Sequence, residues 1–202
     1  MNEGSEIIKL PEPRFKSKIS LEETLLKRRS VRDYKDEPLN LEEISQLLWA
    51  AQGITSPEGL RTAPSAGALY PIEVYIVVGK VNDLPTGIYK YKPQTHELER
   101  ISEGDERIKL SEAALGQIWV KKAPAVIVFS AVYERTTAKY GERGTKYVHM
   151  EVGHASQNVY LQAEALNLGS VTVGAFDDEE VKKIMGMPGE EKPLYIMPVG
   201  KK

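Results

Sequence analysis

The run of apolar residues at 125–132, AVIVFSAV, constrains the fold more than any other segment of the chain. A strand with one face in water alternates apolar and polar residues, whereas a strand covered on both faces is apolar along most of its length. We therefore predict a strand at 125–132 that lies inside a sheet, with other parts of the chain packed on both of its faces.

Further strand-like runs lie on both sides of this segment in the sequence. Two of them are separated only by the polar turn KPQTH, which indicates a hairpin. Hairpin-connected strands mixed with helices are typical of the α+β class rather than of a regular βαβ winding. The predicted strands are Glu73–Val78, Gly87–Tyr91, Glu97–Ile101, Ser170–Val173 and Leu194–Val199.

Helix starts are marked by capping residues. Ser20 with Glu23 and Asn40 with Glu43 have the spacing of a capping box, in which each side chain bonds the other residue's backbone N–H. Asp177, followed by Glu180, has the same spacing. Apolar periodicity predicts a long helix from about 147 to 167 that ends at Gly169, and a short one at 106–115.

Three segments are predicted to lie outside regular structure. Residues 1–18 contain Pro11, Pro13 and mixed charge, and are expected to form an extended arm, disordered alone or wrapped on a partner subunit. Residues 54–71 are dense in Pro, Gly, Ser and Thr, which is typical of a loop. Residues 133–146 are polar with two glycines, and are expected to be a mobile excursion.

Composition excludes several classes of function. The chain has no cysteine, which removes disulfides, thiolate nucleophiles and cysteine-ligated metal. A net charge of -2 provides no global attraction for nucleic acid or anionic membranes. No apolar stretch approaches the roughly 18–20 residues that span a bilayer. We expect a cytoplasmic, single-domain protein over residues 1–202, with no nucleic-acid or membrane partner.

The pentapeptide at 28–32 is the first candidate binding motif. Arg28, Arg29 and Arg32 offer three guanidinium groups and Ser30 a hydroxyl, which suits a phosphate dianion. The motif follows the C-terminal end of a predicted helix, where the helix dipole repels anions. Phosphate binding would therefore depend on the side-chain charges. The alternative is that the arginines only complement the helix end.

Two turns are further candidates. Pro64, Ser65, Ala66 and Gly67 are residues whose backbone can approach a flat ring closely, as flavin sites require, although ordinary turns have this composition too. The sequence Val173-Gly174-Ala175-Phe176 joins a strand to a helix. Backbone amides in such a turn can bond a ligand, and a plain junction capped by Asp177 is the simpler interpretation.

No metal site is predicted. His149 and His154 are five residues apart and so differ by about 500° of helical rotation, which puts them on different faces. We interpret both, with Glu151, as residues of an interface or a polar face. Ser65 has no evident His or Asp partners, so the sequence offers nothing for a hydrolase.

Taken in order, five segments resemble the nitroreductase family over roughly residues 20–202. The segments are RRSVRDY, APSAGALYP, the helix EVGHASQNVYLQAEALNLGS, VGAF and the closing PVG. The second and third are most similar to the SagB-type branch, the flavin dehydrogenases associated with thiazole and oxazole peptide synthesis. Many nitroreductases have Asn and Gln where this chain has Ala68 and Tyr70, a departure that puts a nitroaromatic or quinone preference in doubt.

The resemblance implies a fold, a cofactor and a set of contacts. It implies a central, mostly antiparallel sheet flanked by helices, in an intertwined homodimer with FMN at the subunit interface. No side chain is implied as catalytic, because the flavin carries the hydride chemistry. The implied contacts are Arg28, Arg29, Ser30 and Arg32 for the phosphate and ribityl chain; Pro64, Ser65, Ala66, Gly67 and Leu69 for the ring; the Gly174 and Ala175 amides for its N5–O4 edge; and Lys201 or Lys202 for the phosphate.

Three functions stay open on the sequence. The first is an FMN oxidoreductase that uses NAD(P)H or a similar donor and a small organic acceptor. The second is a SagB-like dehydrogenase or oxidase of an azoline or another small molecule. The third is a flavin-binding protein without turnover. Arg135, Lys139, Tyr140 and Arg143 are the polar groups with which segment 133–146 could contact a substrate, unless it is an ordinary solvated loop.

Overall fold

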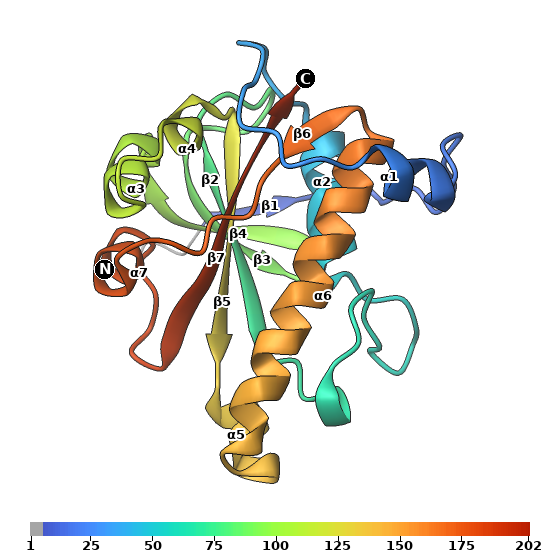
Figure 1. Ribbon diagram of the computed structural model, residues 1–202, viewed down its shortest axis with the longest axis vertical. Helices are drawn as coiled ribbons and strands as arrows, with labels where there is room; N and C mark the ends of the chain where they lie inside the picture. The colour runs from blue at the N-terminus through green and yellow to red at the C-terminus, as the bar shows by residue number, and fades with distance from the viewer. Residues whose placement is uncertain (1–5) are drawn as a thin grey trace.

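A computed structural model describes residues 6–202, in which one seven-stranded sheet forms the centre of the molecule (Figure 1). The strand order is β1-β4-β3-β2-β5-β7-β6, and each neighbouring pair is antiparallel. The predicted α+β class and antiparallel sheet are therefore confirmed. The strands are β1 (Ile7–Lys9), β2 (Ile72–Val78), β3 (Gly87–Lys92), β4 (Glu97–Glu103), β5 (Ala125–Val132), β6 (Leu168–Ser170) and β7 (Glu191–Lys201).

Helices cover both faces of this sheet. Helices α2 and α6 pack on one face, and α3, α4 and α7 pack on the other (Figure 1). The helices are α1 (Leu21–Lys27), α2 (Leu41–Gln52), α3 (Arg107–Ala113), α4 (Ile118–Lys122), α5 (Glu134–Tyr140), α6 (Arg143–Ala165) and α7 (Asp178–Ile184), with a 3-10 helix η1 (Ala66–Ala68).

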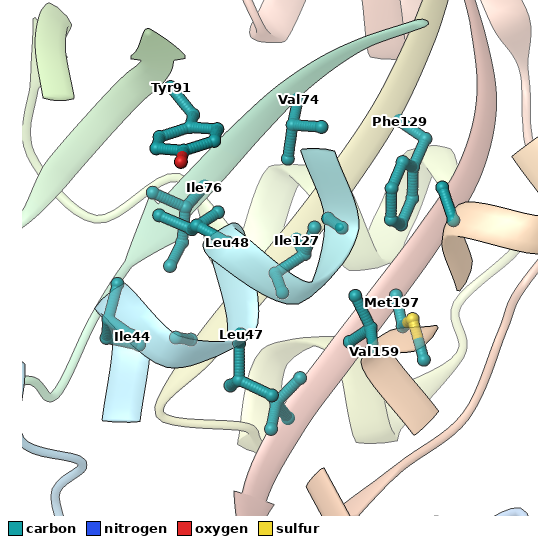
Figure 2. Packing of buried hydrophobic residues seen from close by; sticks show 14 of the residues in the cluster. Ile44, Leu47, Leu48, Val74, Ile76, Tyr91, Ile127, Phe129, Val159 and Met197 are labelled. Carbon is teal, nitrogen blue, oxygen red and sulfur yellow. The ribbon is translucent and has the colours of Figure 1, made fainter. Parts of the chain in front are cut away.

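Strand β5 supplies side chains to two separate cores. Ile127 and Phe129 point into the core under α2 and α6, where Figure 2 shows them beside residues of both helices. Val126 and Val128 point into the core under α3, α4 and α7. Burying each such side chain contributes about 1.5–3 kcal/mol. The predicted strand at 125–132, buried on both faces, is confirmed.

The predicted helix starts are confirmed by their caps. The Ser20 hydroxyl accepts a hydrogen bond from the Glu23 N–H (3.2 Å), and the Glu23 carboxylate accepts one from the Ser20 N–H (3.3 Å). Asn40 and Glu43 form the same reciprocal pair at the start of α2, and Asp177 caps α7. Such caps typically contribute about 1 kcal/mol each.

The arm predicted at 1–18 packs, within residues 6–18, on the chain's own surface. Strand β1 pairs with β4, and Leu10 is buried in the core beneath α2. The Arg14 N–H donates to Gln46 Oε1 over 2.8 Å, which fixes the arm against α2. Residues 1–5 lie outside the described part of the chain.

The prediction of a mobile excursion at 133–146 is wrong. Most of this segment is helical, because α5 occupies its first half and α6 begins at Arg143. The break between the two helices is at Gly141, whose φ of 57° is a conformation that glycine adopts without steric cost. Polarity suggested a loop here because one face of this helical hairpin is in solvent.

The predicted end of the long helix at Gly169 is also wrong. Helix α6 stops at Ala165, and Gly169 lies in strand β6. A Cβ on Gly169 would lie 2.6 Å from Val31 Cγ1, so glycine is needed for the close approach of the 28–32 segment. Gly169 is therefore required for packing, although its place in the sequence is typical of a glycine that ends a helix.

Other boundaries differ for local reasons. Strand β6 ends at Ser170, and only Val173 beyond it pairs again, with Ile196. Strand β7 starts at Glu191 rather than Leu194. Leu194 bulges out, and pairing with β5 resumes at Pro193 and continues to Glu191. Helix α4 was not predicted, because five residues are too few to establish a helical period.

Candidate functional site

The segment 28–32 lies along the edge strand β6. Arg28 caps the C-terminus of α1, and the Val31 N–H donates to the Ser170 carbonyl oxygen over 2.9 Å. Ser30 forms a parallel bridge with Ser170, so the segment continues the sheet beyond β6. The side chains of the predicted phosphate motif are thus held on a fixed backbone.

Two of the three guanidinium groups of this segment lie over aromatic rings. Arg28 Cζ is 5.1 Å from the centroid of Tyr160, and Arg32 Cζ is 5.5 Å from Trp119. Within residues 6–202 neither has a carboxylate partner. Contact with a ring face leaves guanidinium N–H groups free for a further acceptor, so both could bind an anion.

Arg29 is engaged differently from its two neighbours. Its Nη1 donates to the carbonyl oxygens of Leu26 (3.0 Å) and Arg28 (2.7 Å). These are carbonyl groups at the C-terminal end of α1 that the helix itself leaves unsatisfied. For Arg29 the structure therefore has the helix-end role that the sequence left as an alternative.

The ring-lining candidates Pro64, Ser65, Ala66, Gly67 and Leu69 form a tight turn around η1. The Ser65 hydroxyl accepts a hydrogen bond from the Tyr70 N–H over 2.9 Å. Gly67 has φ 65°, and a Cβ built on it would lie 2.8 Å from Tyr140 Oη, so α5 closes over this turn.

Two residues of the same turn hold an unusual backbone conformation. Ala68 and Tyr70 have φ values of 55° and 47°, in a region that costs a non-glycine residue roughly 1–2 kcal/mol. Such strain persists where the surroundings impose it, and it is concentrated at ligand sites. The sequence offered no signal for it, because neither residue is one of the usual left-handed types.

The turn after Val173 presents two free backbone donors. Val173 is fixed by a reciprocal pair of hydrogen bonds with Ile196 (2.7 and 3.0 Å). The next residues, Gly174 and Ala175, are exposed, and their N–H groups have no acceptor among residues 6–202. The Ala175 carbonyl accepts from Gln117 Nε2 over 3.0 Å, which holds the turn open.

The two terminal lysines are already paired with carboxylates. Lys201 Nζ bonds Glu43, and Lys202 Nζ lies 2.6 Å from Glu164 Oε2. Both pairs tie the end of β7 to helices of the α2–α6 face. A phosphate contact from either lysine would require it to leave its carboxylate.

Helix α6 separates the two main groups of candidates. Asn158 Nδ2 donates to the Thr62 carbonyl over 3.2 Å, so this side of α6 faces the loop that leads to Ser65. Tyr160, which lies under Arg28, is two residues and therefore about 200° further around the helix. In Figure 1 the η1 segment lies beside the lower part of α6 and α1 near its upper end. The chain does not bring 28–32 and 64–69 together.

Glu151 is buried, at 2% exposed. The prediction that it lies on an interface or polar face with His149 and His154 is therefore wrong. Burial raises its pKa to about 7, against the opposing effects of the Ser65 hydroxyl and the Arg61 guanidinium. Its spacing from Val148 and Ala155 on the apolar stripe was the available signal.

The other two residues of that motif are exposed, with His149 Nε2 2.7 Å from the Tyr133 hydroxyl. Between residues 6 and 202, no group of three or more His, Cys, Asp or Glu side chains could hold a metal ion. In the same range, every helix is too short or too polar to cross a membrane.

Sequence comparison identifies the family of this chain. The sequence model of the Nitroreductase family matches residues 25–201, which include the segments 28–32, 64–69 and 173–176. The chain belongs to the nitroreductase family. Membership of this family puts it among the oxidoreductases by class, and confirms the resemblance found in the sequence.

Individual relatives agree with this result. The nitroreductase-like protein MJ1384 of Methanocaldococcus jannaschii is 50% identical over 184 residues, covering 91% of this chain and 92% of its own. A nitroreductase-like structure from Ralstonia eutropha superposes with a TM-score of 0.85 at 31% identity, over 100% of this chain and 91% of that one.

More distant relatives carry more specific names. The microcin B17-processing protein McbC of Escherichia coli is 28% identical over 155 residues, or 74% of this chain and 57% of McbC. An FMN reductase [NAD(P)H] of Bacillus subtilis is 24% identical over 193 residues, or 88% of this chain and 64% of the reductase. The McbC match agrees with the likeness to the SagB-type branch.

Proposed function

We propose that the chain binds FMN and transfers electrons between NAD(P)H, or a similar donor, and a small organic acceptor. The observation that carries this proposal is the pair of guanidinium groups on Arg28 and Arg32, which lack a carboxylate partner in the described chain and lie on a fixed backbone. The family and its FMN reductase member support the choice of FMN as the phosphate-bearing ligand. In this proposal residues 1–202 act as a single FMN-binding domain.

The donor set fits the parts of FMN in three places. Arg28 and Arg32, with Arg29 and Ser30, would hold the phosphate and ribityl chain. The turn at 64–69 would lie along the isoalloxazine ring, with Ser65 as its hydroxyl group. The free N–H groups of Gly174 and Ala175 would donate to the N5–O4 edge. Lys201 and Lys202 fit least well, because each already has a carboxylate partner.

The two sides of α6 support a dimeric site. Since 28–32 and 64–69 face opposite sides of α6, one flavin would contact both only if each chain supplied one of them. Helix α1 exposes Leu21, Leu25 and Leu26, a run of apolar side chains that a second copy of this chain would cover. We therefore propose an intertwined homodimer with one FMN per subunit at the interface.

The protein's own contribution is positioning and electrostatics. Bound FMN would supply the hydride chemistry at its N5 atom. The Gly174 and Ala175 amides would orient this edge and stabilise charge that develops on the ring. Tyr140 and Lys139, which approach Gly67 from α5, would restrict access of water and of the acceptor to the ring.

A second candidate function is a SagB-like dehydrogenase or oxidase of an azoline or similar small molecule. Ala68 and Tyr70 replace the Asn and Gln of many nitroreductases, and the McbC relative favours the same branch. The chain matches 57% of McbC, so that protein's activity is carried over here only as a proposal.

Anaerobic reduction distinguishes the two candidates. The purified protein is reconstituted with FMN, and its flavin absorbance is recorded before and after NADH or NADPH is added. Bleaching by either nucleotide supports the first function. Bound flavin that neither nucleotide bleaches would favour the second function or a flavin-binding protein without turnover, and failure to bind FMN would refute all three.

A further inference from the structure

Glu151 is a buried acid directly behind the turn that carries Ser65. It lies on the side of α6 that faces residues 54–71, seven residues and so about two helical turns before Asn158. Its Oε1 has no hydrogen-bond partner in the described chain. A buried carboxylate oxygen without a partner is costly, which favours protonation or a contact not yet made.

Ser65 is the hydroxyl that this acid can influence. The Ser65 oxygen accepts from the Tyr70 N–H over 2.9 Å, so the direction of its own proton is not fixed by the backbone. The hydroxyl is close enough to the Glu151 carboxylate to lower its pKa by hydrogen bonding. Ser65 can donate either to an ionised Glu151 or to a ligand, but a single proton cannot serve both.

The charges around Glu151 are few. Arg61 faces it from the loop, and Arg61 is in turn bonded to Gln52 of α2, which is neutral and fully buried. Arg61 is already engaged: its Nη1 donates to Gln52 Oε1 over 2.8 Å, and its Cζ lies 4.4 Å from the Tyr70 ring centroid. The charged and titratable groups that act on Arg61 besides Glu151 are Glu73, Tyr70 and Arg135.

We propose that Glu151 is a positioning residue that sets the direction of the Ser65 hydroxyl proton, and thereby how tightly the 64–69 turn binds the flavin. Protonated Glu151 donates to the Ser65 oxygen and leaves the Ser65 proton for the ligand. Ionised Glu151 accepts a hydrogen bond from the Ser65 hydroxyl, which is then no longer available as a donor to the ligand. This inference rests on the proposed function, since it requires flavin at the 64–69 turn.

The change between these two hydrogen-bond arrangements occurs near neutral pH, because burial raises the pKa of Glu151 to about 7. FMN affinity is therefore expected to weaken as pH rises from 6 to 8. One hydrogen bond typically contributes about 0.5–1.5 kcal/mol, so the weakening expected from the lost donor is roughly twofold to tenfold. The FMN phosphate also titrates near pH 6, but it does so equally in every variant.

The test measures the dissociation constant of FMN from quenching of its fluorescence at pH 6 and pH 8. Wild-type protein, Glu151→Gln and Ser65→Ala are compared, with Glu142→Gln as a control for an exposed acid beside the start of the same helix. Both Glu151→Gln and Ser65→Ala should lose the extra weakening at pH 8, whereas Glu142→Gln should keep it. Combining Glu151→Gln with Ser65→Ala should add nothing further.

A second readout needs no flavin. Infrared difference spectra of the apoprotein should contain the band of a protonated carboxylic acid that titrates near pH 7 in wild type and in Ser65→Ala, and is absent from Glu151→Gln. Weakening of FMN binding at pH 8 that is as large in Glu151→Gln or in Ser65→Ala as in wild type overturns this inference alone. Wild-type protein that binds no FMN at either pH overturns the proposed function, and the inference with it.

Discussion

Asn158 and Tyr160 are two residues apart on α6 and face opposite sides of it. Asn158 bonds the Thr62 carbonyl of the loop that leads to Ser65, while the Tyr160 hydroxyl accepts from the Thr172 N–H over 2.6 Å and its ring lies under Arg28. One helix therefore supports both groups of candidate flavin contacts. The rotation around the helix axis from Asn158 to Tyr160 determines the angle between the two groups of contacts.

Replacement of Arg28 or Arg32 by Ala is expected to abolish retention of FMN. Each substitution would remove a charge-assisted contact between a guanidinium group and the phosphate, which contributes about 1.5–3 kcal/mol. Flavin absorbance after gel filtration of the reconstituted protein measures this. Lys183→Ala, which removes an exposed cation on α7, should retain flavin. Arg29→Ala should have a smaller effect, because Arg29 already bonds two carbonyl groups. Tight retention by Arg28→Ala would refute the phosphate assignment.

A charge on the exposed apolar face of α1 is expected to separate the subunits. Leu26→Glu would place a carboxylate where a partner subunit should bury a leucine, a loss of about 1.5–3 kcal/mol per chain before the cost of the charge. Light scattering should detect monomers, and FMN affinity should fall roughly tenfold or more with them. Leu115→Glu, an equally exposed leucine beside α3, is the matched control and should remain dimeric. Equal FMN affinity in monomer and dimer would contradict a shared site.

Loss of Lys90 is expected to destabilise the fold strongly. Glu191 is 2% exposed, and it is bonded by Lys90 Nζ (2.5 Å), the Tyr75 hydroxyl (2.8 Å) and the Ser130 hydroxyl (2.7 Å). Lys90→Met would leave a buried charge without its cation, at a cost of about 3–5 kcal/mol. Urea unfolding measures the change. Lys27→Met, in an exposed pair with Glu23, should cost less than about 1 kcal/mol.

The pH dependence of stability should include a component from Glu151. Its folded pKa of about 7 exceeds the ordinary value of 4.5, so the folded state binds the proton more tightly than the unfolded state does. The contribution of Glu151 to the free energy of unfolding is fully present below pH 4.5 and declines as pH rises towards 7. Glu151→Gln should therefore raise the unfolding free energy at pH 8 by about 1–3 kcal/mol and change it little at pH 4. Equal effects at both pH values would mean that Glu151 does not titrate in this range.

Local signals in the sequence were sufficient for much of the fold. The capping pairs at Ser20 and Asn40 act over three residues, and the apolar run of β5 reports its own burial, so each could be recognised without knowledge of the rest of the chain. The wrong helix end at Gly169 arose because the local pattern was incomplete. Gly169 is required by Val31, more than 130 residues away in sequence, and that requirement is invisible locally.

The candidate site was less accessible to sequence reasoning than the fold. Residue chemistry and the family resemblance proposed Arg28, Ser65 and Gly174 as candidates, but not their relation across α6. The pairing of Lys201 with Glu43, and the position of Glu151 behind Ser65, join segments distant in sequence. No local pattern specifies such contacts, because they depend on how the helices pack on the sheet.

The alternation along β5 has a consequence for how this chain can change. Val128 and Phe129 are neighbours, yet they belong to different cores on opposite faces of the sheet. Substitutions without shared neighbours are usually additive in their effects on stability. The α2–α6 face, which carries the turn at Ser65, can therefore accumulate new side chains for a new acceptor while the α3–α4–α7 face keeps the protein folded. The two faces of β5 thus separate the part of the chain that can evolve a new specificity from the part that maintains stability.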